Sequence, residues 1–315
     1  MKLHALVTQY IAFRESFGED FCSSARLLRQ FSRAMGTELE ADEIQPAQVK
    51  TFLDGSRPLS SYWHRKQSIL RGLYRYAITR GLLDTSPLPA QAPKRPPAVT
   101  PYIYTQEELR RLLEATTFLR HGNRQFEPET FRVMLLLLYG AGLRLCEALA
   151  LNCSNYDPAG ALITIRDTKF HKTRLVPLGA DLNQALANYV TAYHRTESRR
   201  SESAPLFPSR DGARLTEHAI RRSFQRLRTI AGVQRTDGAR YQPRLHDLRH
   251  SFAVHRLTAW YQAGADVQKL LPRLSTYLGH VNVAATQIYL TMTPELLQLA
   301  SERFAQYALQ EVNHD

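Results

Sequence analysis

Proline is concentrated in one short stretch of the chain, and this stretch limits how the chain can fold. Six of the 16 prolines fall between Pro87 and Pro101, in PLPAQAPKRPPAVTP. Proline fixes φ and lacks a backbone N–H, so this stretch can neither continue a helix nor pair as a central strand. We therefore expect a linker at 87–101 between an N-terminal domain, 1–86, and a C-terminal domain, 102–315. A chain of 315 residues is long enough to form two cores.

The N-terminal part shows the apolar periodicity of helices. Apolar residues recur about every 3.6 positions, which predicts helices at 3–17, 22–35, 46–54 and 60–80. Pro46 suits the first turn of the third helix, and Ser60 or Ser61 is a good cap for the fourth. The N-terminal domain is thus predicted to be a small bundle of four helices.

The fourth predicted helix carries charge of one sign. From Gly55 to Leu83 there are six basic residues and no acidic one, interleaved with tyrosines and a tryptophan. The whole chain has a net charge of +12. A solvated helix usually mixes both signs, so this segment favours contact with nucleic-acid phosphates over a plain basic surface. The candidate DNA contacts here are Arg65, Lys66, Arg71 and Arg75.

The C-terminal part mixes helices with one hairpin. Thr105 and Glu108 form a capping box at a helix start, and PETFRVMLLLLYGAGLR contains a nearly all-apolar helix that must be buried. ALITIRDTKFHKTRLVPL, residues 161–178, predicts a β-hairpin with TKFHKT at its tip. Further helices are expected at 181–197, from Thr216, and over most of the chain beyond Asp247. The predicted fold class is mainly α with a small antiparallel β-sheet.

The helix that begins at Thr216 is a second candidate for DNA contact. In TEHAIRRSFQRLRTI, Ile220, Phe224 and Leu227 form the stripe expected to be buried. That leaves a set of arginines largely free, namely Arg221, Arg222, Arg226 and Arg228.

Cysteine content and hydropathy indicate the cellular compartment. The longest apolar run, Val133 to Leu143, is too short for a bilayer, which needs about 20 residues. The N-terminus lacks a signal-peptide layout. The three cysteines form neither an even set nor a C-x-x-C pair, so free thiols in a reducing compartment are expected. We expect a soluble cytoplasmic protein.

RLHDLRHSFA, residues 244–253, places three basic side chains on one face of a predicted helix. His246 lies three residues before Arg249 and four before His250. Two histidines at this spacing resemble a zinc-protease helix, but Arg249 would lie beside the cation and the glutamate that activates water is missing. Zinc is therefore disfavoured.

A second arginine follows the apolar helix. GAGLRLCEALAL puts Arg144 just after two glycines, with Glu147 one turn away. A structural ion pair with Glu147 is one interpretation. The other is that Arg144 and Arg249 converge on a phosphodiester, whose transition state gains negative charge that guanidinium groups bind bidentately. The sequence shows no carboxylate cluster suited to Mg²⁺, and no metal or cofactor is expected.

A nucleophile is available in LSTYLGHVNVAATQIYLTMTPE, residues 274–295. His280 follows a glycine, and Tyr289 comes nine residues later. A phenol with its usual pKa near 10 attacks poorly, but arginines would stabilise the phenolate. Taken alone, Tyr289 could equally pack an amphipathic helix.

Four segments in this order, GAGLRLCEAL, TKFHKTRLVPL, HDLRHSFA and YLGHVNVAATQIY, resemble the tyrosine recombinase (phage integrase) family over essentially the whole C-terminal domain. The four N-terminal helices resemble that family's SAM-like core-binding domain. The resemblance implies a site-specific recombinase that cleaves and rejoins DNA for integration, excision or resolution of a mobile element. A non-catalytic DNA-binding regulator of the same fold, and a type IB topoisomerase, are the alternatives.

The resemblance also implies roles for residues at matching positions. Arg144 and Arg249 would bind the scissile phosphate, with Glu147 supporting Arg144. His246 and His280 would hydrogen-bond the phosphate and assist proton transfer. His250 follows Arg249 in the family motif too, and we expect it to pack or hydrogen-bond behind the site.

The resemblance assigns the bond-making and bond-breaking steps to two further positions. Tyr289 would attack phosphorus to leave a 3′-phosphotyrosyl bond and a free 5′-hydroxyl. Lys169 on the hairpin would protonate the leaving 5′-oxygen as general acid. Many relatives have glycines flanking this lysine, whereas Thr168 and Phe170 stand here. The turn is therefore shaped differently, and Lys172 is a rival for the role and another candidate DNA contact.

Recombination joins two duplexes, so the resemblance implies a homodimer on each site and a homotetramer at synapsis. We expect the two domains to form a C-shaped clamp around duplex DNA. The C-terminal segment carries apolar residues near one helical stripe, which would dock on a neighbouring subunit or pack within its own chain: Leu296, Leu297, Ala300, Phe304, Tyr307 and Ala308.

Overall fold

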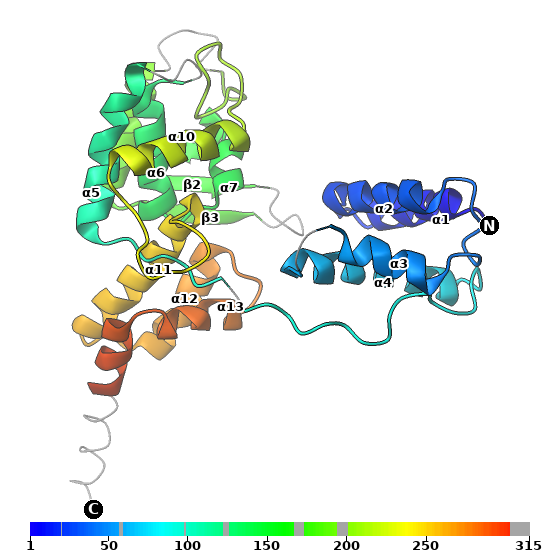
Figure 1. Ribbon diagram of the computed structural model, residues 1–315. Coiled ribbons are helices and arrows are strands. Elements are labelled where there is room, and N and C mark those ends of the chain that lie inside the picture. Colours follow the sequence, from blue (N-terminus) through cyan, green and yellow to red (C-terminus); the bar gives the residue numbers. More distant parts are fainter. Residues whose placement is uncertain are drawn as a thin grey trace, which may run out of the picture. The chain divides into compact units, whose positions relative to one another are not determined.

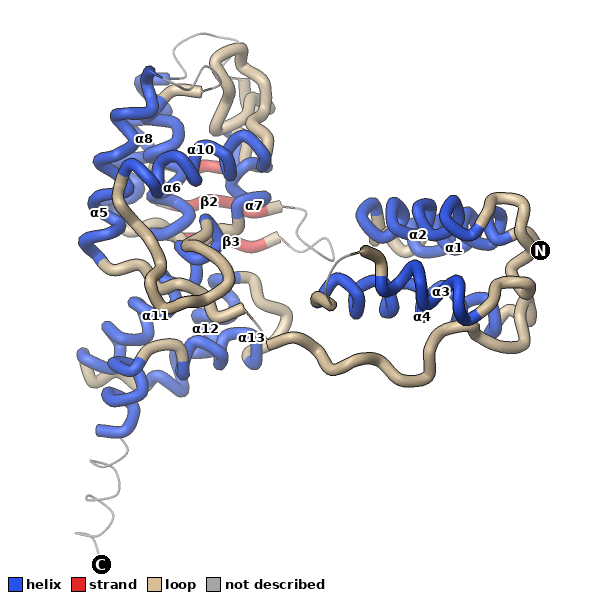
Figure 2. Tube along the Cα trace, viewed as in Figure 1, coloured by secondary structure: helices blue, strands red, loops and turns tan. Residues whose placement is uncertain are grey.

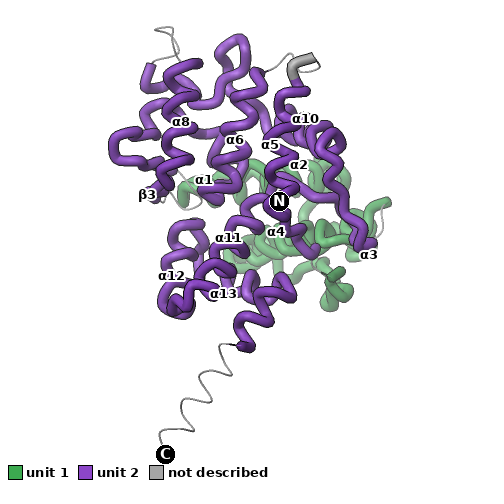
Figure 3. Tube along the Cα trace, turned by 90° about the vertical axis from the view of Figure 1, so that its left-hand side faces the viewer, with its two compact units in different colours: residues 1–98 green, residues 99–315 purple. Residues whose placement is uncertain are grey.

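The computed structural model describes residues 1–19, 21–56, 59–97, 99–121, 126–166, 173–193 and 201–302. The chain divides into two compact units, Met1–Ala98 and Val99–Asp315 (Figure 3). The boundary between them falls inside the proline-rich stretch. Helices dominate both units, and the second adds one three-stranded antiparallel sheet (Figure 2), which confirms the predicted fold class.

Unit 1 is a bundle of four helices (Figure 1). They are α1 (Leu3–Glu15), α2 (Cys22–Met35), α3 (Pro46–Asp54) and α4 (Ser61–Thr79), each within two residues of its predicted ends. Pro46 opens α3, and the Ser60 side chain accepts a hydrogen bond from the Tyr62 backbone N–H, as expected for a cap. The apolar faces of all four helices meet in one core that includes Leu6, Leu28 and Leu70.

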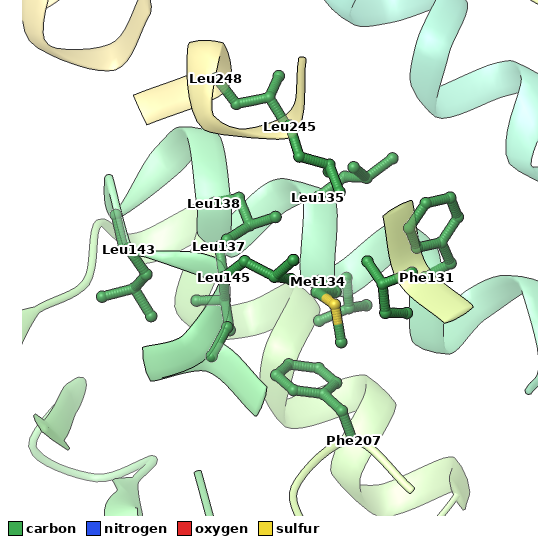
Figure 4. Packing of buried hydrophobic residues seen from close by; sticks show 14 of the residues in the cluster. Phe131, Met134, Leu135, Leu137, Leu138, Leu143, Leu145, Phe207, Leu245 and Leu248 are labelled. Carbon is green, nitrogen blue, oxygen red and sulfur yellow. The ribbon is translucent and has the colours of Figure 1, made fainter. Parts of the chain in front are cut away.

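Helix α6 (Pro128–Gly140) is the centre of unit 2. Phe131, Met134 and Leu137 are buried in its core (Figure 4). The elements that open the unit are α5 (Gln106–Ala115) and η1 (Thr116–His121); the helices that follow α6 are α7 (Leu145–Ala150), α8 (Ala180–Tyr193) and α10 (Glu217–Ile230). Helix α6 is contacted by η1, α7, α8 and α11 (Leu245–Gln262). These contacts cover it on several sides, which explains its nearly all-apolar sequence.

The sheet of unit 2 has the order β1-β2-β3. Its strands are β1 (Tyr156–Asp157), β2 (Leu162–Ile165) and β3 (Arg174–Pro177). Ile163 pairs with Val176 and Ile165 with Arg174, so β2 and β3 form the predicted hairpin. Residues 167–172, which hold most of the predicted tip, lie outside the described residues.

The last part of unit 2 is helical, as predicted. After α11 come α12 (Val267–Leu278), α13 (Ala284–Gln287) and η3 (Ile288–Thr291), and residues 294–302 are again helical. These elements share a second core that contains Phe252, Leu278 and Tyr289. No helix in the described part of the chain is long and apolar enough to cross a membrane. None of the three cysteines forms a disulfide, as expected.

Gly142 allows the turn between α6 and α7 to approach the second core. Its φ is +59°, a left-handed conformation that glycine adopts without strain. A Cβ added there would lie 2.7 Å from Phe252 Cδ1 and 2.9 Å from Leu278 Cδ2. The turn therefore needs glycine for its backbone conformation and for its packing.

We expect Gly142→Ala to destabilise unit 2. A left-handed alanine costs about 1–2 kcal/mol, and overpacking against Phe252 and Leu278 adds about 1–3 kcal/mol. The control is Gly238→Ala, because Gly238 has a φ of +70° but an added Cβ meets no described atom within 4 Å. Chemical denaturation of both variants measures the difference, and equal losses would contradict the packing argument.

Candidate active site

Arg249 is the most deeply buried cation of the candidate site. It lies on α11, which starts with a capping interaction: the Arg244 backbone N–H donates to Asp247 at 2.8 Å. The Arg249 residue is 1% exposed. Its Nη1 donates to the Gly142 carbonyl at 2.6 Å and its Nη2 to the Leu278 carbonyl at 2.5 Å. The guanidinium group therefore joins α11 to the α6–α7 turn and to the end of α12.

Burial and the nearby charge of Arg144 lower the pKa of Arg249 to about 10. The group remains positively charged at neutral pH. Each terminal nitrogen carries a second N–H besides the one that bonds a carbonyl. Arg249 thus combines a fixed position with donors suited to an anion.

Arg144 is held at the edge of the same cluster. It is the N-cap residue of α7, and its backbone N–H donates to Glu147 at 2.9 Å. Its side chain donates from Nη1 to Glu147 at 2.7 Å and from Nη2 to the Gly279 carbonyl at 3.1 Å. The predicted pairing with Glu147 is present. It leaves Arg144 about one third exposed, at the margin between protein and solvent.

Arg174 on β3 belongs to this network, although it was not among the predicted site residues. Its two terminal nitrogens donate to the two oxygens of Glu147 at 2.9 and 2.8 Å, and its Nε donates to the Tyr277 carbonyl at 3.1 Å. A signal was available, because strand alternation places Arg174 on the same face as the buried Val176. An arginine on a buried face needs an acidic partner, and Glu147 is that partner.

Glu147 is a buried carboxylate between two arginines. Burial alone raises its pKa, but hydrogen bonds and charge from Arg174, followed by Arg144, lower that pKa to about 2. The carboxylate is therefore ionised at neutral pH. Because it neutralises part of the charge of Arg174 and Arg144, it stabilises the closely spaced cations of the site.

Two histidines extend from α11 beside Arg249. The rings of His246 and His250 are 4.7 Å apart and nearly perpendicular. His246 is on the exposed side. Desolvation, and next the charge of Arg249, lower its pKa, so the imidazole is neutral at neutral pH.

His280 enters the site from the end of α12. The helix ends at Gly279, which has left-handed φ and ψ of +68° and 43°. The Nδ1 of His280 lies 2.7 Å from the Thr286 hydroxyl. Burial, then the charges of Arg249 and Arg144, lower the His280 pKa to about 4. This histidine is also neutral at neutral pH.

Tyr289 lies on η3 and completes the cluster. The residue is 2% exposed. Its ring stacks near that of His280, with centroids 6.1 Å apart, and its hydroxyl lies 3.2 Å from His250 Nδ1. Burial raises the Tyr289 pKa, whereas the charges of Arg249 and Arg144 oppose that rise. The residue is a protonated phenol beside two cations.

The described residues of the predicted site thus meet in one place: Arg144, Glu147, His246, Arg249, His280 and Tyr289. Lys169 and Lys172 lie outside the described residues. Two fixed guanidinium groups, neutral histidines and a phenol form a set able to bind a phosphodiester and to attack it.

Sequence comparison decides the family. The model of the Phage integrase family matches residues 103–295. The chain is also 36% identical over 303 residues to y4rB, a candidate integrase/recombinase of Sinorhizobium fredii, and the match covers 94% of this chain and 95% of that protein. The chain belongs to the phage integrase family. Members are tyrosine recombinases, enzymes that cleave and rejoin DNA strands.

Other relatives agree with this assignment. A tyrosine recombinase XerC of Thermodesulfovibrio yellowstonii is 26% identical over 80% of this chain and 79% of its own. Among solved structures, the Tn1549 transposon integrase in complex with transposon right end DNA has a TM-score of 0.69 at 18% identity, covering 97% of this chain and 100% of that one. A λ integrase dimer bound to a core site has a TM-score of 0.65 at 16% identity, covering 93% and 78%. These structures show that the integrase fold is shared.

The candidate DNA contacts on α4 of this integrase have different environments. Arg71 and Arg75 are exposed. Arg65 is exposed too, and donates to the Ser23 hydroxyl at 2.8 Å. Lys66 instead donates to the Phe52 and Leu53 carbonyls at 2.6 and 3.1 Å, at the end of α3. Its ammonium group is used inside unit 1, so Lys66 is a poorer candidate for phosphate contact than Arg71 and Arg75.

Helix α10 buries the predicted stripe: Ile220, Phe224 and Leu227 are all in the core. The expectation that its arginines are largely free needs correction. Arg228 is half-buried and donates to the Pro243 carbonyl at 2.9 Å, and Arg221 pairs with Glu217 at 3.0 Å. Both bonds stabilise the local fold. Arg222 and Arg226 are exposed.

We expect the contribution of Glu147 to stability to disappear in acid. Its folded pKa is about 2 and its unperturbed value is 4.5, so the stabilisation is complete above pH 4.5 and is lost as the pH falls toward 2. The measurement is the free energy of unfolding of wild type and Glu147→Gln at about pH 7 and about pH 3.5. The difference in the free energy of unfolding between wild type and Glu147→Gln is smaller by about 1 kcal/mol at the lower pH.

The matched control is Glu129→Gln, at an exposed surface pair with Arg132 whose N···O distance is 3.6 Å. A surface pair of this kind contributes little, so its variant should stay close to wild type at both pH values. If the difference in unfolding free energy between wild type and Glu147→Gln did not change with pH, the stabilising role of the ionised Glu147 carboxylate would be contradicted.

Proposed function

We propose that this integrase cleaves DNA with Tyr289 as nucleophile, and that Arg144 and Arg249 bind the scissile phosphate. The observation that carries the proposal is the position of Arg249: it is buried, is fixed by two backbone carbonyls, and lies beside Arg144 and the Tyr289 phenol. A buried guanidinium so fixed needs no reorganisation when negative charge develops on the phosphate oxygens.

The proposed chemical step is a transesterification. The Tyr289 oxygen forms a bond to phosphorus, and the bond from phosphorus to the 5′-oxygen breaks. The phenolic proton passes to a neutral histidine of the site, His246 or His280, and Lys169 donates a proton to the 5′-oxygen, with Lys172 as its rival. The phosphotyrosyl ester keeps the bond energy, so rejoining to a 5′-hydroxyl reverses the step without ATP.

Access to Tyr289 is part of the proposal. The residue is buried in the DNA-free chain, but its hydroxyl points to the histidines and arginines of the site and not into the apolar core alone. A phosphate that approaches past the exposed His246 would meet Arg144 first and Arg249 behind it. We propose that a local shift of η3, a single short turn, then exposes the phenolic oxygen.

The substrate proposed is duplex DNA bound by both units. Exposed arginines on α4 and α10 supply candidate backbone contacts, which would close the two units around the duplex. The related solved structures include a λ integrase dimer on a core site and a λ integrase tetramer on a Holliday junction. By analogy we propose a homodimer on each site and a homotetramer at synapsis.

The C-terminal stripe gives partial support to docking between subunits. Leu296 is fully buried in the second core of its own chain, so this part of the stripe packs in cis. Leu297 is 47% exposed and remains available to a neighbour. Phe304, Tyr307 and Ala308 lie outside the described residues.

We propose that the biological role is movement or resolution of a mobile element, carried out on DNA in the cytoplasm. The Tn1549 relative acts as a transposon integrase, and its complex contains transposon end DNA. The need for defined DNA sites distinguishes this proposal from a topoisomerase role. Recombination requires such sites, whereas relaxation of a supercoiled plasmid that lacks them would favour a topoisomerase.

We expect a nicked substrate to trap a covalent protein–DNA complex. A duplex selected by the full chain from a random-sequence library is nicked next to each phosphate in turn, so that the short 5′-hydroxyl strand diffuses away after attack. Wild type then accumulates a complex that resists denaturing gel electrophoresis. Tyr289→Phe forms none, because it lacks the attacking oxygen.

Two outcomes of this trapping experiment would overturn the proposal. A Tyr289→Phe protein that still forms the complex would exclude Tyr289 as nucleophile. Wild type that binds the selected DNA but never forms a complex would favour the non-catalytic regulator. Lys169→Ala and Lys172→Ala in the same assay identify the general acid. The variant that lacks the acid releases the 5′-hydroxyl strand more slowly, because nothing protonates the leaving 5′-oxygen.

We also expect exposed arginines of α4 to set the salt dependence of DNA binding. Removing two phosphate contacts with Arg71→Gln and Arg75→Gln together reduces the slope of log K against log salt by about 2. Arg110→Gln is the control, because Arg110 pairs with Glu107 and Glu114 on the surface of α5. Titration of the selected duplex at several salt concentrations measures the slopes. An unchanged slope in the double variant would remove α4 from the DNA interface.

A further inference from the structure

His250 makes a direct contact with the proposed nucleophile. It follows the buried Arg249 on α11, and its Nδ1 lies 3.2 Å from the Tyr289 hydroxyl. The two rings are 5.6 Å apart at an angle of 56°. From the sequence, His250 was expected to pack or hydrogen-bond behind the site, with no partner named and no part in the chemistry. The contact therefore needs a separate explanation.

The direction of this hydrogen bond follows from the protonation of its partners. Burial is the main cause, and the charge interaction with His246 the next, that lower the pKa of His250 to about 4. Its imidazole is therefore neutral at neutral pH. Burial also keeps Tyr289 in its phenol form. The phenol is then the donor and Nδ1 the acceptor, which puts the ring proton of His250 on Nε2.

The backbone around Tyr289 offers little local restraint. Tyr289 belongs to the single turn η3, which follows the four-residue helix α13. Helices this short depend on tertiary contacts for their position. The ring packs in the second core, but packing alone does not fix where the hydroxyl points. The hydrogen bond to His250 supplies that orientation, because α11 is a long helix anchored by Arg249.

We propose that His250 is a positioning residue for the nucleophile: its Nδ1 accepts a hydrogen bond from the Tyr289 phenol and holds the phenolic oxygen of the same chain beside Arg249 before attack. The inference rests on the proposed role of Tyr289. It adds a residue outside the set that binds phosphate, and it assigns that residue an effect on the rate of attack and not on DNA binding.

Two substitutions separate hydrogen bonding from packing. Asparagine at 250 places an amide oxygen close to the position of Nδ1, so His250→Asn keeps an acceptor for the phenol. His250→Leu fills a similar volume and has no acceptor. Should His250→Leu fail to fold, His250→Gln replaces it, because its longer amide reaches toward the position of Nε2 and away from the Tyr289 hydroxyl.

The first measurement is the single-turnover rate of covalent complex formation on the nicked duplex at saturating protein. Loss of one neutral hydrogen bond predicts a rate roughly tenfold lower for His250→Leu. DNA affinity stays at the wild-type value, and His250→Asn recovers most of the rate. A purely structural role would predict similar defects in both variants.

The second measurement is made without DNA. The free energy of unfolding is compared for wild type, His250→Leu, Tyr289→Phe and the double variant. If the hydroxyl bonds to His250, the effect of His250→Leu is smaller in the Tyr289→Phe protein, because the partner is already gone. If His250 only packs, the effect is the same in both backgrounds.

The outcomes distinguish this inference from the function on which it rests. Wild-type rates for His250→Leu, with no complex from Tyr289→Phe, would overturn the positioning role and leave the nucleophile in place. Equal defects in His250→Asn and His250→Leu would also overturn it. A covalent complex formed by Tyr289→Phe would instead overturn the proposed function itself.

Discussion

The Arg249 guanidinium group, bonded to two backbone carbonyls, is the interaction on which the site depends. The Gly142 carbonyl lies 107 residues away in sequence and the Leu278 carbonyl 29 residues away. Charge-assisted hydrogen bonds of this kind are stronger than neutral ones, and a buried guanidinium left without them would be very costly. The positions of the α6–α7 turn and of the α12 end are therefore tied to that of Arg249. Arg144 follows the α6–α7 turn directly and His280 follows the end of α12 directly, whereas Tyr289 comes later, on η3 after α13.

Glu147 makes a high local density of positive charge compatible with a stable fold. The positive charges of Arg144 and Arg174 both act on the buried Arg249 and lower its pKa. Glu147 binds two of them, and Arg174 also reaches the Tyr277 carbonyl on α12. This arrangement joins the β2–β3 hairpin to the segment that carries His280. Glu147 thus stabilises the contact between the sheet and the end of α12, beside the Arg144 side chain.

Local patterns in the sequence predicted most of the fold and most of the site. Helix ends followed from caps such as Ser60 and from Pro46, because these effects act within a few residues. The buried stripe of α10 followed from periodicity. Arg144, His246, Arg249, His280 and Tyr289 came from motifs whose order resembled a known family, and the structure brings them together.

The sequence could not predict contacts between distant segments. Arg174 bonds to Tyr277 over a separation of 103 residues, and no local pattern encodes that pairing. The contact of His250 with Tyr289 spans 39 residues. The one-sign charge of its segment predicts that Lys66 is part of a basic face, whereas the Lys66 ammonium group donates to backbone carbonyls at the end of α3. In each case the polar group satisfies a partner whose position only the folded chain defines.

The protonation states of the site fit the proposed role of Tyr289 as a nucleophile that is activated only when DNA binds. Burial raises the pKa of Tyr289 and lowers those of His250 and His280, so the phenol and both imidazoles are neutral at neutral pH. A phosphate brought to Arg144 and Arg249 would act on this balance in two opposing ways. Its negative charge raises the pKa of the neighbouring histidines, which makes them better proton acceptors. It also occupies guanidinium N–H groups that otherwise favour the phenolate, which raises the pKa of the Tyr289 phenol. The phenol therefore stays protonated until a histidine takes its proton, and the histidines become better acceptors only when the phosphate is in place, which couples the proposed proton transfer to the presence of its target.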